Sequence, residues 1–268
     1  MLVLQEMRYD SLVLSGGAMK GFVQLGALES LFTRGGVDPR FRRYVGTSVG
    51  SIIAYLLAIG YTPMEIFTIA YNENLGADFA EPEYASLVSQ YGVYQPRALR
   101  RVLADATLER LGYLPTLGQV GSELVCVAYN VSRGETVYWS SFDHPDLPAL
   151  DAVEMSSRLP FVYPPFVYEG EDYVDGMFGD HFPLLAADGA TLGLYTPVSA
   201  PAGAGLLGYF YRVSLAPIRE ITRDRIRRAA HTSVLTLSYP EKSFLNFSLS
   251  PGEKMHMFSH GYRLAESA

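Results

Sequence analysis

Two consecutive segments with the same order of features constrain the fold of this chain most strongly. The first runs from an apolar stretch at 11–14 through the glycine-rich turn SGGAMKG into apolar residues at helical spacing, and it ends at Gly35-Gly36. The second runs from 43–45 through GTSVG into another apolar helical pattern that ends at Gly60. Two strand–turn–helix units in succession are typical of a parallel sheet with helices on its faces. We therefore predict an α/β fold.

The rest of the chain adds strands and helices to this frame. Residues 63–121 are expected to be helical and irregular, with Pro63 in the first turn of a helix. Apolar and β-branched runs bounded by glycine, proline and serine predict the other elements. In order, these are a hairpin of 123–130 and 135–140, a proline-broken loop at 159–165, strands at 171–176 and 191–198, a loop at 201–208, and a closing helix that follows the capping box Ser250-Pro251-Gly252-Glu253.

The amount of apolar material predicts one large core. Of the 268 residues, 49% are hydrophobic and 18% are charged, and α/β folds of about 200–250 residues commonly form one domain. We expect a single domain over 1–268, with the motif-bearing part at about 11–183 and C-terminal strands and the closing helix at 184–268. Cys126 is the only cysteine and lies in an apolar run, so we expect it in the core and without a disulfide partner in the chain.

Net charge and the lengths of apolar stretches bear on partners and location. The net charge of -7 gives no general attraction to nucleic acid, and any membrane contact must be local. Residues 1–10 lack the basic start and apolar stretch of a signal peptide. The longest apolar stretch, 49–61, is interrupted and falls short of the ~20 residues that a spanning helix needs. We expect a cytoplasmic or peripheral membrane protein.

GTSVG matches the pattern G-x-S-x-G, with Ser48 between Gly46 and Gly50. In a nucleophile elbow the serine occupies a strained turn between a strand and a helix, and the glycines let neighbouring backbone approach closely. The helix start behind the serine also favours developing negative charge. Ser48 is therefore the candidate nucleophile, and the alternative is a glycine-lined turn with an inert serine.

SGGAMKG lacks the features of a nucleotide-binding loop. In the pattern G-x-x-x-x-G-K-[ST] a serine or threonine follows the lysine, whereas Gly21 follows Lys20 here. What remains is a row of backbone N–H groups, from Gly16, Gly17 and Ala18, at a helix start that tolerates an anion. Beside a serine nucleophile, the relevant anion is the oxyanion of a tetrahedral intermediate.

A serine nucleophile needs a base, and the sequence offers two kinds. Asp175, in YVDGMFGDHFP, lies at a predicted strand end and precedes Gly176, which lets the backbone approach closely. Capping of a turn is the alternative role for this aspartate. A histidine could instead complete a Ser-His-Asp triad, although none has a distinctive sequence context. The histidines are His144, His181, His231, His256 and His260.

The order of SGGAMKG, GTSVG and YVDGMFGDHFP, with MSSRLPFVYPPF before the last, resembles the motifs of the patatin-like phospholipase family. The resemblance spans most of the chain, from Leu12 to Pro183. It implies a three-layer α/β/α fold with a mainly parallel central sheet, and hydrolysis of phospholipids or other lipid esters through a Ser-Asp dyad, with no catalytic histidine and no cofactor. The implied site residues are Ser48 as nucleophile, Asp175 as base, and Gly16, Gly17 and Ala18 as oxyanion donors.

The chain departs from the family's motifs at several positions. Ala18 stands at the third glycine of the turn; it keeps its N–H and can serve as a donor if it does not need a positive φ. Met177 replaces a glycine or alanine, and Asp180-His181 replaces paired asparagines, which leaves a role open for His181. Lys20 matches a basic position, and we expect it to anchor nearby carbonyl groups.

Two sets of side chains bear on lipid contact. Arginines at 223, 225, 227 and 228 could contact anionic lipid, but the acidic residues among them favour a solvated helix face. Aromatic residues that flank the motifs either line an acyl groove or a membrane-facing surface, or belong to the core. They are Phe22, Phe161, Tyr163, Phe166, Phe178 and Phe182.

Three functions therefore remain open at this point. The first is a lipid acyl hydrolase of the phospholipase A or lysophospholipase type, active in a chelator because the chain has no D-x-[DN]-x-[DN]-G calcium pattern. The second is a Ser-His-Asp hydrolase of the α/β-hydrolase kind with His181 or His231 as base. The third is a non-catalytic lipid-binding protein on the same fold.

Overall fold

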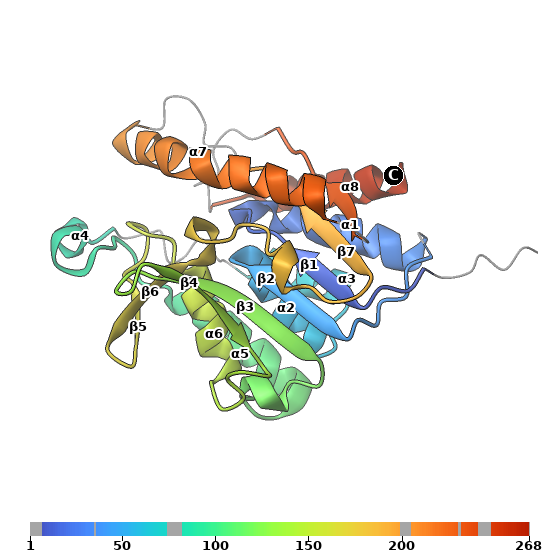
Figure 1. Cartoon of the computed structure of the whole chain (residues 1–268), viewed down its shortest axis with the longest axis horizontal. Coiled ribbons are helices and arrows are strands. Elements are labelled where there is room, and N and C mark those ends of the chain that lie inside the picture. Colours follow the sequence, from blue (N-terminus) through green and yellow to red (C-terminus); the bar gives the residue numbers. More distant parts are fainter. Residues whose placement is uncertain are drawn as a thin grey trace, which may run out of the picture.

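Strands and helices alternate along most of the chain in the computed structural model, which describes residues 7–34, 36–73, 82–198, 205–229, 232–240 and 248–267 (Figure 1). The strands are β1 Ser11–Leu14, β2 Arg43–Thr47, β3 Glu123–Asn130, β4 Glu135–Ser140, β5 Phe166–Tyr168, β6 Glu171–Asp175, β7 Thr191–Tyr195 and β8 Thr232–Thr236. The helices are α1 Gly21–Thr33, α2 Val49–Ala58, α3 Pro63–Asn72, α4 Tyr84–Gln90, α5 Arg97–Leu111, α6 Ala149–Ser157, α7 Gly205–Arg228 and α8 Pro251–Glu266. Short 3-10 turns cover Ala18–Lys20, Leu117–Gln119, Gly176–Phe178 and Leu184–Ala186.

The described strands form one sheet in the order β5-β6-β3-β2-β1-β7-β8, with β4 paired to β3. The neighbours among β3, β2, β1, β7 and β8 run parallel, whereas β4, β5 and β6 pair in antiparallel fashion. The chain moves from β1 to β2 on one side and later returns to β7 on the other side of β1. Crevices at the carboxyl ends of strands form where the order reverses in this way. The mainly parallel sheet confirms the prediction.

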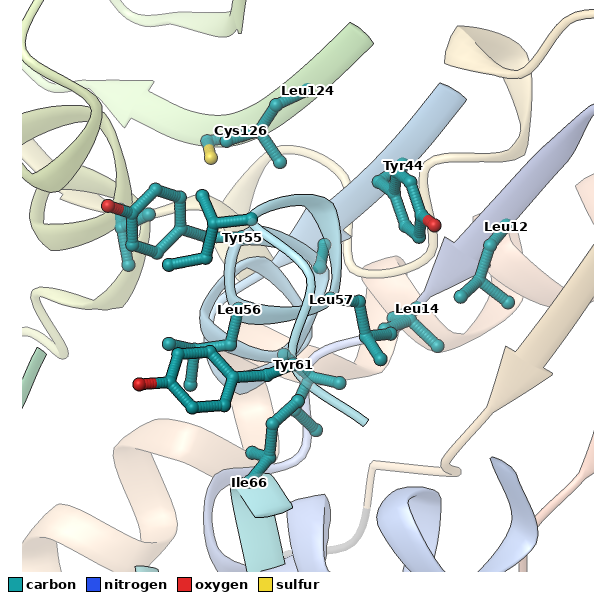
Figure 2. Close-up of a cluster of buried hydrophobic side chains, with 14 of the residues drawn as sticks. Leu12, Leu14, Tyr44, Tyr55, Leu56, Leu57, Tyr61, Ile66, Leu124 and Cys126 are labelled. Atoms are coloured by element: carbon teal, nitrogen blue, oxygen red, sulfur yellow. The ribbon is translucent and has the colours of Figure 1, made fainter. Parts of the chain in front are cut away.

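Alternate side chains of the central strands face two different layers. Leu12, Leu14 and Tyr44 belong to the main core against α2, as Figure 2 shows. Val13, between Leu12 and Leu14, and Val45, next to Tyr44, belong to a second core on the other face of the sheet, to which α7 contributes. Strands covered on both faces read as continuous apolar runs, which explains the run Leu12-Val13-Leu14 of β1. The fold therefore has three layers, α/β/α.

The closing helix α8 packs directly on α1. The predicted capping box is present, with the side chain of Ser250 accepting from the Glu253 N–H. A Cβ atom at Gly26 of α1 would lie 1.9 Å from the carbonyl oxygen of Phe258, and one at Gly261 of α8 would lie 1.9 Å from that of Val23. Only glycine permits this approach of the two backbones.

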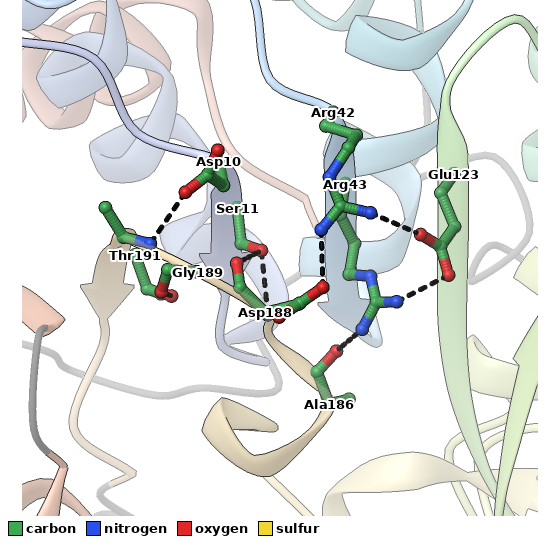
Figure 3. A network of polar contacts seen from close by, with 10 residues as sticks. Asp10, Ser11, Arg42, Arg43, Glu123, Ala186, Asp188, Gly189 and Thr191 are labelled. Carbon is green, nitrogen blue, oxygen red and sulfur yellow. Dashed lines mark hydrogen bonds and ion pairs between the residues drawn. The ribbon is translucent and has the colours of Figure 1, made fainter.

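A polar network fixes the amino ends of the central strands, at the edge of the sheet away from the turns that follow β1 and β2 (Figure 3). Arg43 donates to Glu123 at 2.7 Å and to the carbonyl of Ala186 at 2.8 Å. Arg42 donates to Asp188 at 2.6 Å. These contacts hold β2, β3 and the segment before β7 together at this edge.

Two elements differ from the prediction. The loop expected at 201–208 is helical from Gly205, while 201–204 lie outside the described residues. Tyr211 and Leu215 of α7 are buried against Leu159 and Met177, so tertiary packing overrides the local preference of the glycines. The short strand β5, directly after the proline-broken loop, was not expected either. The hairpin and the other predicted strands are confirmed, although the strand expected at 191–198 ends at Tyr195 and the one expected at 171–176 ends at Asp175.

Candidate active site

Ser48 and Asp175 come together because two strands end against consecutive residues of a third. β2 pairs with β3 as far as Thr47↔Val127, and β6 pairs with it as far as Asp175↔Ala128. Since β4 occupies the other edge of β3 at this point, β2 and β6 share one edge. They run in opposite directions, so their carboxyl ends meet there. Ser48 is the first residue after β2, and Asp175 is the last residue of β6.

The two side chains form a hydrogen bond in a buried setting. Ser48 Oγ donates to Asp175 Oδ2 at 2.6 Å, and the N–H of Met177 donates to Oδ1 at 2.9 Å. Asp175 is only 1% exposed. Burial raises its pKa to about 7, although the hydrogen bonds from Ser48 and Met177 act in the opposite direction. A carboxyl group with a pKa near neutrality can accept and return a proton at working pH.

Ser48 has the backbone conformation of a nucleophile elbow, with φ 57° and ψ −126°. This region is unfavourable for a residue with a side chain, and such strain is typical of functional turns. The neighbouring glycines allow close backbone contacts: a Cβ atom at Gly46 would lie 2.3 Å from the Gly50 oxygen, and one at Gly50 would lie 2.3 Å from the Leu14 oxygen. At the other strand, a Cβ at Gly176 would lie 2.1 Å from a carbonyl oxygen of β3.

The glycine-rich turn after β1 lies directly beside Ser48. A Cβ atom at Gly16 would be 3.5 Å from Cβ of Ser48. The N–H of Gly16, however, donates to the carbonyl of His181 at 3.0 Å, which disagrees with the expectation that it is an oxyanion donor. Within the described part of the chain, no hydrogen bond engages the N–H groups of Gly17 and Ala18. The candidate donor set therefore narrows to these two residues.

Two further residues complete this turn. Ala18 has φ +47°, so the expectation that it avoids a positive φ was wrong: the residue adopts the left-handed region at a cost in backbone strain. It still has its N–H, which therefore remains a candidate donor. Lys20 is buried, and its Nζ donates to the carbonyl of Pro197 at 2.8 Å, in the segment after β7. Lys20 thus anchors a nearby carbonyl group, as expected, and ties the turn after β1 to the end of β7.

His181 lies in the same place but makes a different contact. It is 1% exposed, and its Nε2 is 3.0 Å from the carbonyl oxygen of Thr196, so this nitrogen carries the proton. Burial lowers the pKa of His181 to about 4, so the ring is neutral, and its Nδ1 has no partner among the described residues. The Ser48 hydroxyl is bonded to Asp175 and not to this ring. His231 lies outside the described residues.

Sequence reasoning missed several polar residues that support the site. Ser156, within MSSRLPFVYPPF, accepts the N–H of Ser48 at 2.9 Å. Thr47 donates its hydroxyl to the carbonyl of Asp180 at 2.8 Å. The side chain of Asp180 forms an ion pair with Arg225. The expectation that this arginine lies on a solvated helix face was therefore wrong. These partners lie far apart in the chain, and only the position of Ser156 inside a motif could have drawn attention to it.

Half of the aromatic residues that flank the motifs belong to the core. Phe22, Tyr163 and Phe182 are buried. Phe161 is different: it is 37% exposed and packs edge-to-face on Phe210 of α7. The core role therefore holds for three of the six, and Phe161 faces the surface.

Other features lie away from this site. A cleft of about 1000 Å³ opens at the amino-end edge of the sheet, lined among others by Arg42, Arg43 and Phe142, and none of the candidate site residues line it. In the ranges that the structure describes, no three His, Cys, Asp or Glu side chains gather in a metal-binding cluster. None of the described helices has the length and hydropathy of a membrane span.

The fold and the site together define a class of protein: a three-layer α/β protein in which a serine at a strained strand-to-helix turn is hydrogen-bonded to a buried aspartate. Residues 12–188 match the model of the patatin-like phospholipase family, and the chain belongs to this family. It is 29% identical over 188 residues to "Probable lipid hydrolase 463L" of Invertebrate iridescent virus 6, covering 68% of this chain and 64% of that protein. It is 31% identical over 192 residues to "Uncharacterized protein R571" of Acanthamoeba polyphaga mimivirus, covering 69% and 63%. The matches thus span less than two thirds of these relatives.

Solved structures share the fold at low sequence identity. VipD from Legionella pneumophila matches with a TM-score of 0.56 and 16% identity, over 97% of this chain and 67% of that chain. The complex of SpcU with ExoU from the type III secretion system of Pseudomonas aeruginosa matches with a TM-score of 0.50 and 20% identity, over 96% of this chain and 52% of that chain. These likenesses extend the agreement in fold to nearly the whole chain.

Proposed function

We propose that this protein is a lipid acyl hydrolase that cleaves carboxylic ester bonds of phospholipids through Ser48 and Asp175. The observation that carries the proposal is the 2.6 Å hydrogen bond from a strained, strand-end serine to a buried aspartate. Membership of the patatin-like phospholipase family and the printed name of the iridescent virus relative support a lipid ester as the substrate. No cofactor takes part in the proposed reaction.

In the acylation step, Ser48 Oγ attacks the ester carbonyl carbon while its proton passes to Asp175 Oδ2. The carbonyl π electrons move onto oxygen, and the N–H groups of Gly17 and Ala18 donate to this oxyanion. One such donor is typically worth about 2.7–4 kcal/mol to the transition state. The start of α2 lies directly behind Ser48 and adds a favourable field for the same charge. The intermediate then collapses, the ester C–O bond breaks, and Asp175 returns the proton to the leaving alcohol.

In the deacylation step, Asp175 takes a proton from a water molecule, whose oxygen attacks the acyl carbon. The second oxyanion collapses, and the proton passes from Asp175 to Ser48 Oγ as the free fatty acid leaves. A carboxylate with an ordinary pKa of ~3.9 is a weak base at neutral pH. The burial that raises the pKa of Asp175 to about 7 supports this role, because the carboxylate becomes a stronger base and is still available near neutrality.

The decisive experiment is hydrolysis of a panel of phospholipids, each with one labelled acyl position, with and without a chelator. Ser48→Ala and Asp175→Asn should each lower turnover by several orders of magnitude. Matched controls are Ser157→Ala, next to Ser156 on α6, and Asp172→Asn, on the same strand as Asp175, and both should retain turnover. Equal turnover by wild type and Ser48→Ala would rule out the proposed nucleophile, and a strict calcium requirement would contradict the expected activity in chelator.

The same panel identifies which acyl position of the lipid is cleaved. Release of label from both positions of a diacyl lipid, or only from a lysolipid, distinguishes phospholipase A from lysophospholipase activity. Absence of turnover by wild type on every lipid, together with vesicle binding, would favour the non-catalytic lipid-binding alternative. The substrate would be reached by peripheral contact with a membrane, since it is a bilayer component.

A further inference from the structure

Two helices at one end of the molecule present apolar stripes to the outside. On α4 and its C-cap, Tyr84, Val88 and Tyr91 follow each other at helical spacing, and on α7 the same holds for Leu206, Tyr209 and Val213. All six side chains are between 55% and 85% exposed. We call these six residues the α4–α7 surface; α4 and the first turns of α7 lie on the left side of the view in Figure 1. Such a concentration of exposed apolar side chains marks an interaction site.

The α4–α7 surface is one connected structure because a loop joins its two helices. The N–H groups of Val93 and Tyr94, just after α4, donate to the carbonyl of Val162 at 3.1 and 2.9 Å. Phe161, the residue before, packs on Phe210 of α7 with ring centroids 5.0 Å apart. The segment after α4, the 159–165 loop and the first half of α7 are therefore held together.

The same loop connects this surface to the candidate active site. The hydroxyl of Tyr211, on the inner face of α7, donates to the carbonyl of Pro160 at 2.7 Å. The N–H of Asp175 donates to the carbonyl of Arg158 at 2.8 Å. A small core beneath the surface includes Tyr211 and Met177, the latter two residues beyond Asp175. A body that rests on the α4–α7 surface is thus in contact with the structure that holds the proposed base.

The charge pattern favours a lipid surface as this body. Residues 84–94 and 205–211 contain no charged residue, and Arg212 is the first charged side chain that follows in α7. No ionised side chain on these two segments would therefore have to leave water when they enter the headgroup region, and the charges at their borders, Glu83 at the N-cap of α4 and Arg212 on α7, are of opposite sign. Tyrosine combines an apolar ring with a polar hydroxyl and is enriched where protein meets the membrane interface.

We propose that the α4–α7 surface is the face by which this protein docks on a lipid bilayer. The proposal rests on the proposed function, because a bilayer component is the substrate class. In the docked state the stripes of α4 and α7 enter the headgroup region, and the 159–165 loop places the site next to the lipid esters. Burial of these side chains drives partition into the bilayer. Loss of one Leu or Val side chain should lower the partition coefficient roughly tenfold or more.

The test is co-sedimentation with vesicles of phosphatidylcholine and phosphatidylglycerol, in a Ser48→Ala background so that no substrate is consumed. Leu206→Asp and Val88→Asp should each lower partition about tenfold or more. Phe142→Asp and Leu185→Asp are matched controls, since these side chains are 83% and 74% exposed but line the cleft at the amino-end edge. Unchanged thermal unfolding of all four variants shows that each is folded.

The outcomes separate docking from catalysis. Loss of partition in the two α4–α7 variants with full partition in the two controls supports the surface. The proposal is overturned by wild-type partition in both α4–α7 variants, by equal losses in the controls, or by no vesicle binding of the Ser48→Ala parent. Hydrolysis of the soluble ester p-nitrophenyl butyrate by wild type, measured without vesicles, reports on the proposed function alone.

Discussion

Arg225, near the C-terminal end of α7, forms an ion pair with Asp180, whose side chain is only 1% exposed. Tyr138 also donates to this carboxylate, at 2.8 Å. The backbone of Asp180 is engaged too: its N–H donates to Gly176 at 2.8 Å, and its carbonyl accepts from Thr47 at 2.8 Å. Asp180 therefore links the residue before Ser48 to the turn after Asp175, and Arg225 attaches α7 to that link.

Arg225→Ala should destabilise the protein by about 3–5 kcal/mol, because it leaves a buried carboxylate without its counter-charge. Burial already raises the pKa of Asp180, and Arg225 acts against that rise. The measurement is the free energy of unfolding in urea. Arg223→Ala is the matched control, since this exposed arginine pairs with Glu220 on the surface and should cost less than about 1 kcal/mol. Adding Asp180→Asn to Arg225→Ala should recover much of the loss; a double variant as unstable as Arg225→Ala would show that the buried charge is not the cause.

Much of this arrangement could be predicted from sequence where the signal is local. Glycines at fixed offsets from an apolar strand and an apolar helix identified the two turns that hold Ser48 and Ala18. The ion pair of Asp180 could not be predicted, because Arg225 lies far along the chain and on a helix whose first residues, Gly205 to Gly208, read as part of a loop. The pairing of Asp175 with Ser48 was expected only from the resemblance to the patatin-like family, because its geometric basis, β2 and β6 sharing one edge of β3, is specified by no local pattern. The pKa of Asp175 follows from burial and was not predicted for the same reason.

The pH dependence of hydrolysis should follow the pKa of Asp175. Burial raises this pKa to about 7, and the base must be ionised to accept the Ser48 proton. The value of kcat/KM for a soluble ester should therefore rise with pH, reach half its plateau near pH 7, and fall about tenfold per unit on the acid side. A profile whose acid limb lies near pH 4 would show that Asp175 is as well solvated as a free aspartate, contrary to its burial.

Asp175→Asn should make the protein more stable relative to wild type as the pH rises. A carboxyl whose pKa is raised on folding stabilises the folded state when protonated, and this contribution is lost as the pH rises through about 7. The asparagine variant does not titrate. The free energy of unfolding of the variant minus that of wild type should thus increase between about pH 4 and pH 7. The increase should be up to about 4 kcal/mol, since one pKa unit corresponds to about 1.36 kcal/mol. Urea unfolding at both ends of this range gives the difference, and a pH-independent difference would contradict the raised pKa.

Ala18→Gly should not destabilise the protein, although alanine-to-glycine changes normally do. Ala18 has φ +47°, a conformation that costs a residue with a Cβ atom roughly 1–2 kcal/mol of free energy and costs glycine almost none. This gain offsets the extra flexibility of glycine in the unfolded chain, so the free energy of unfolding should rise slightly or stay constant. Ala104→Gly, within α5, is the matched control and should lose about 1 kcal/mol. A loss at position 18 equal to that at position 104 would contradict the strain.

His181→Gln should retain most of the hydrolysis if Asp175 is the base. The glutamine amide reaches the position of Nε2 and can still donate to the carbonyl of Thr196, which is the contact that Nε2 of His181 makes at 3.0 Å. The pKa of His181 is lowered to about 4 by burial, so the ring would be a far weaker base than Asp175 near neutral pH. Single-turnover acylation by a soluble ester measures the step in which the base acts. A fall of several orders of magnitude in this rate, with folding intact, would favour the Ser-His-Asp alternative, because the deletion of a true general base removes catalysis as completely as deletion of the nucleophile.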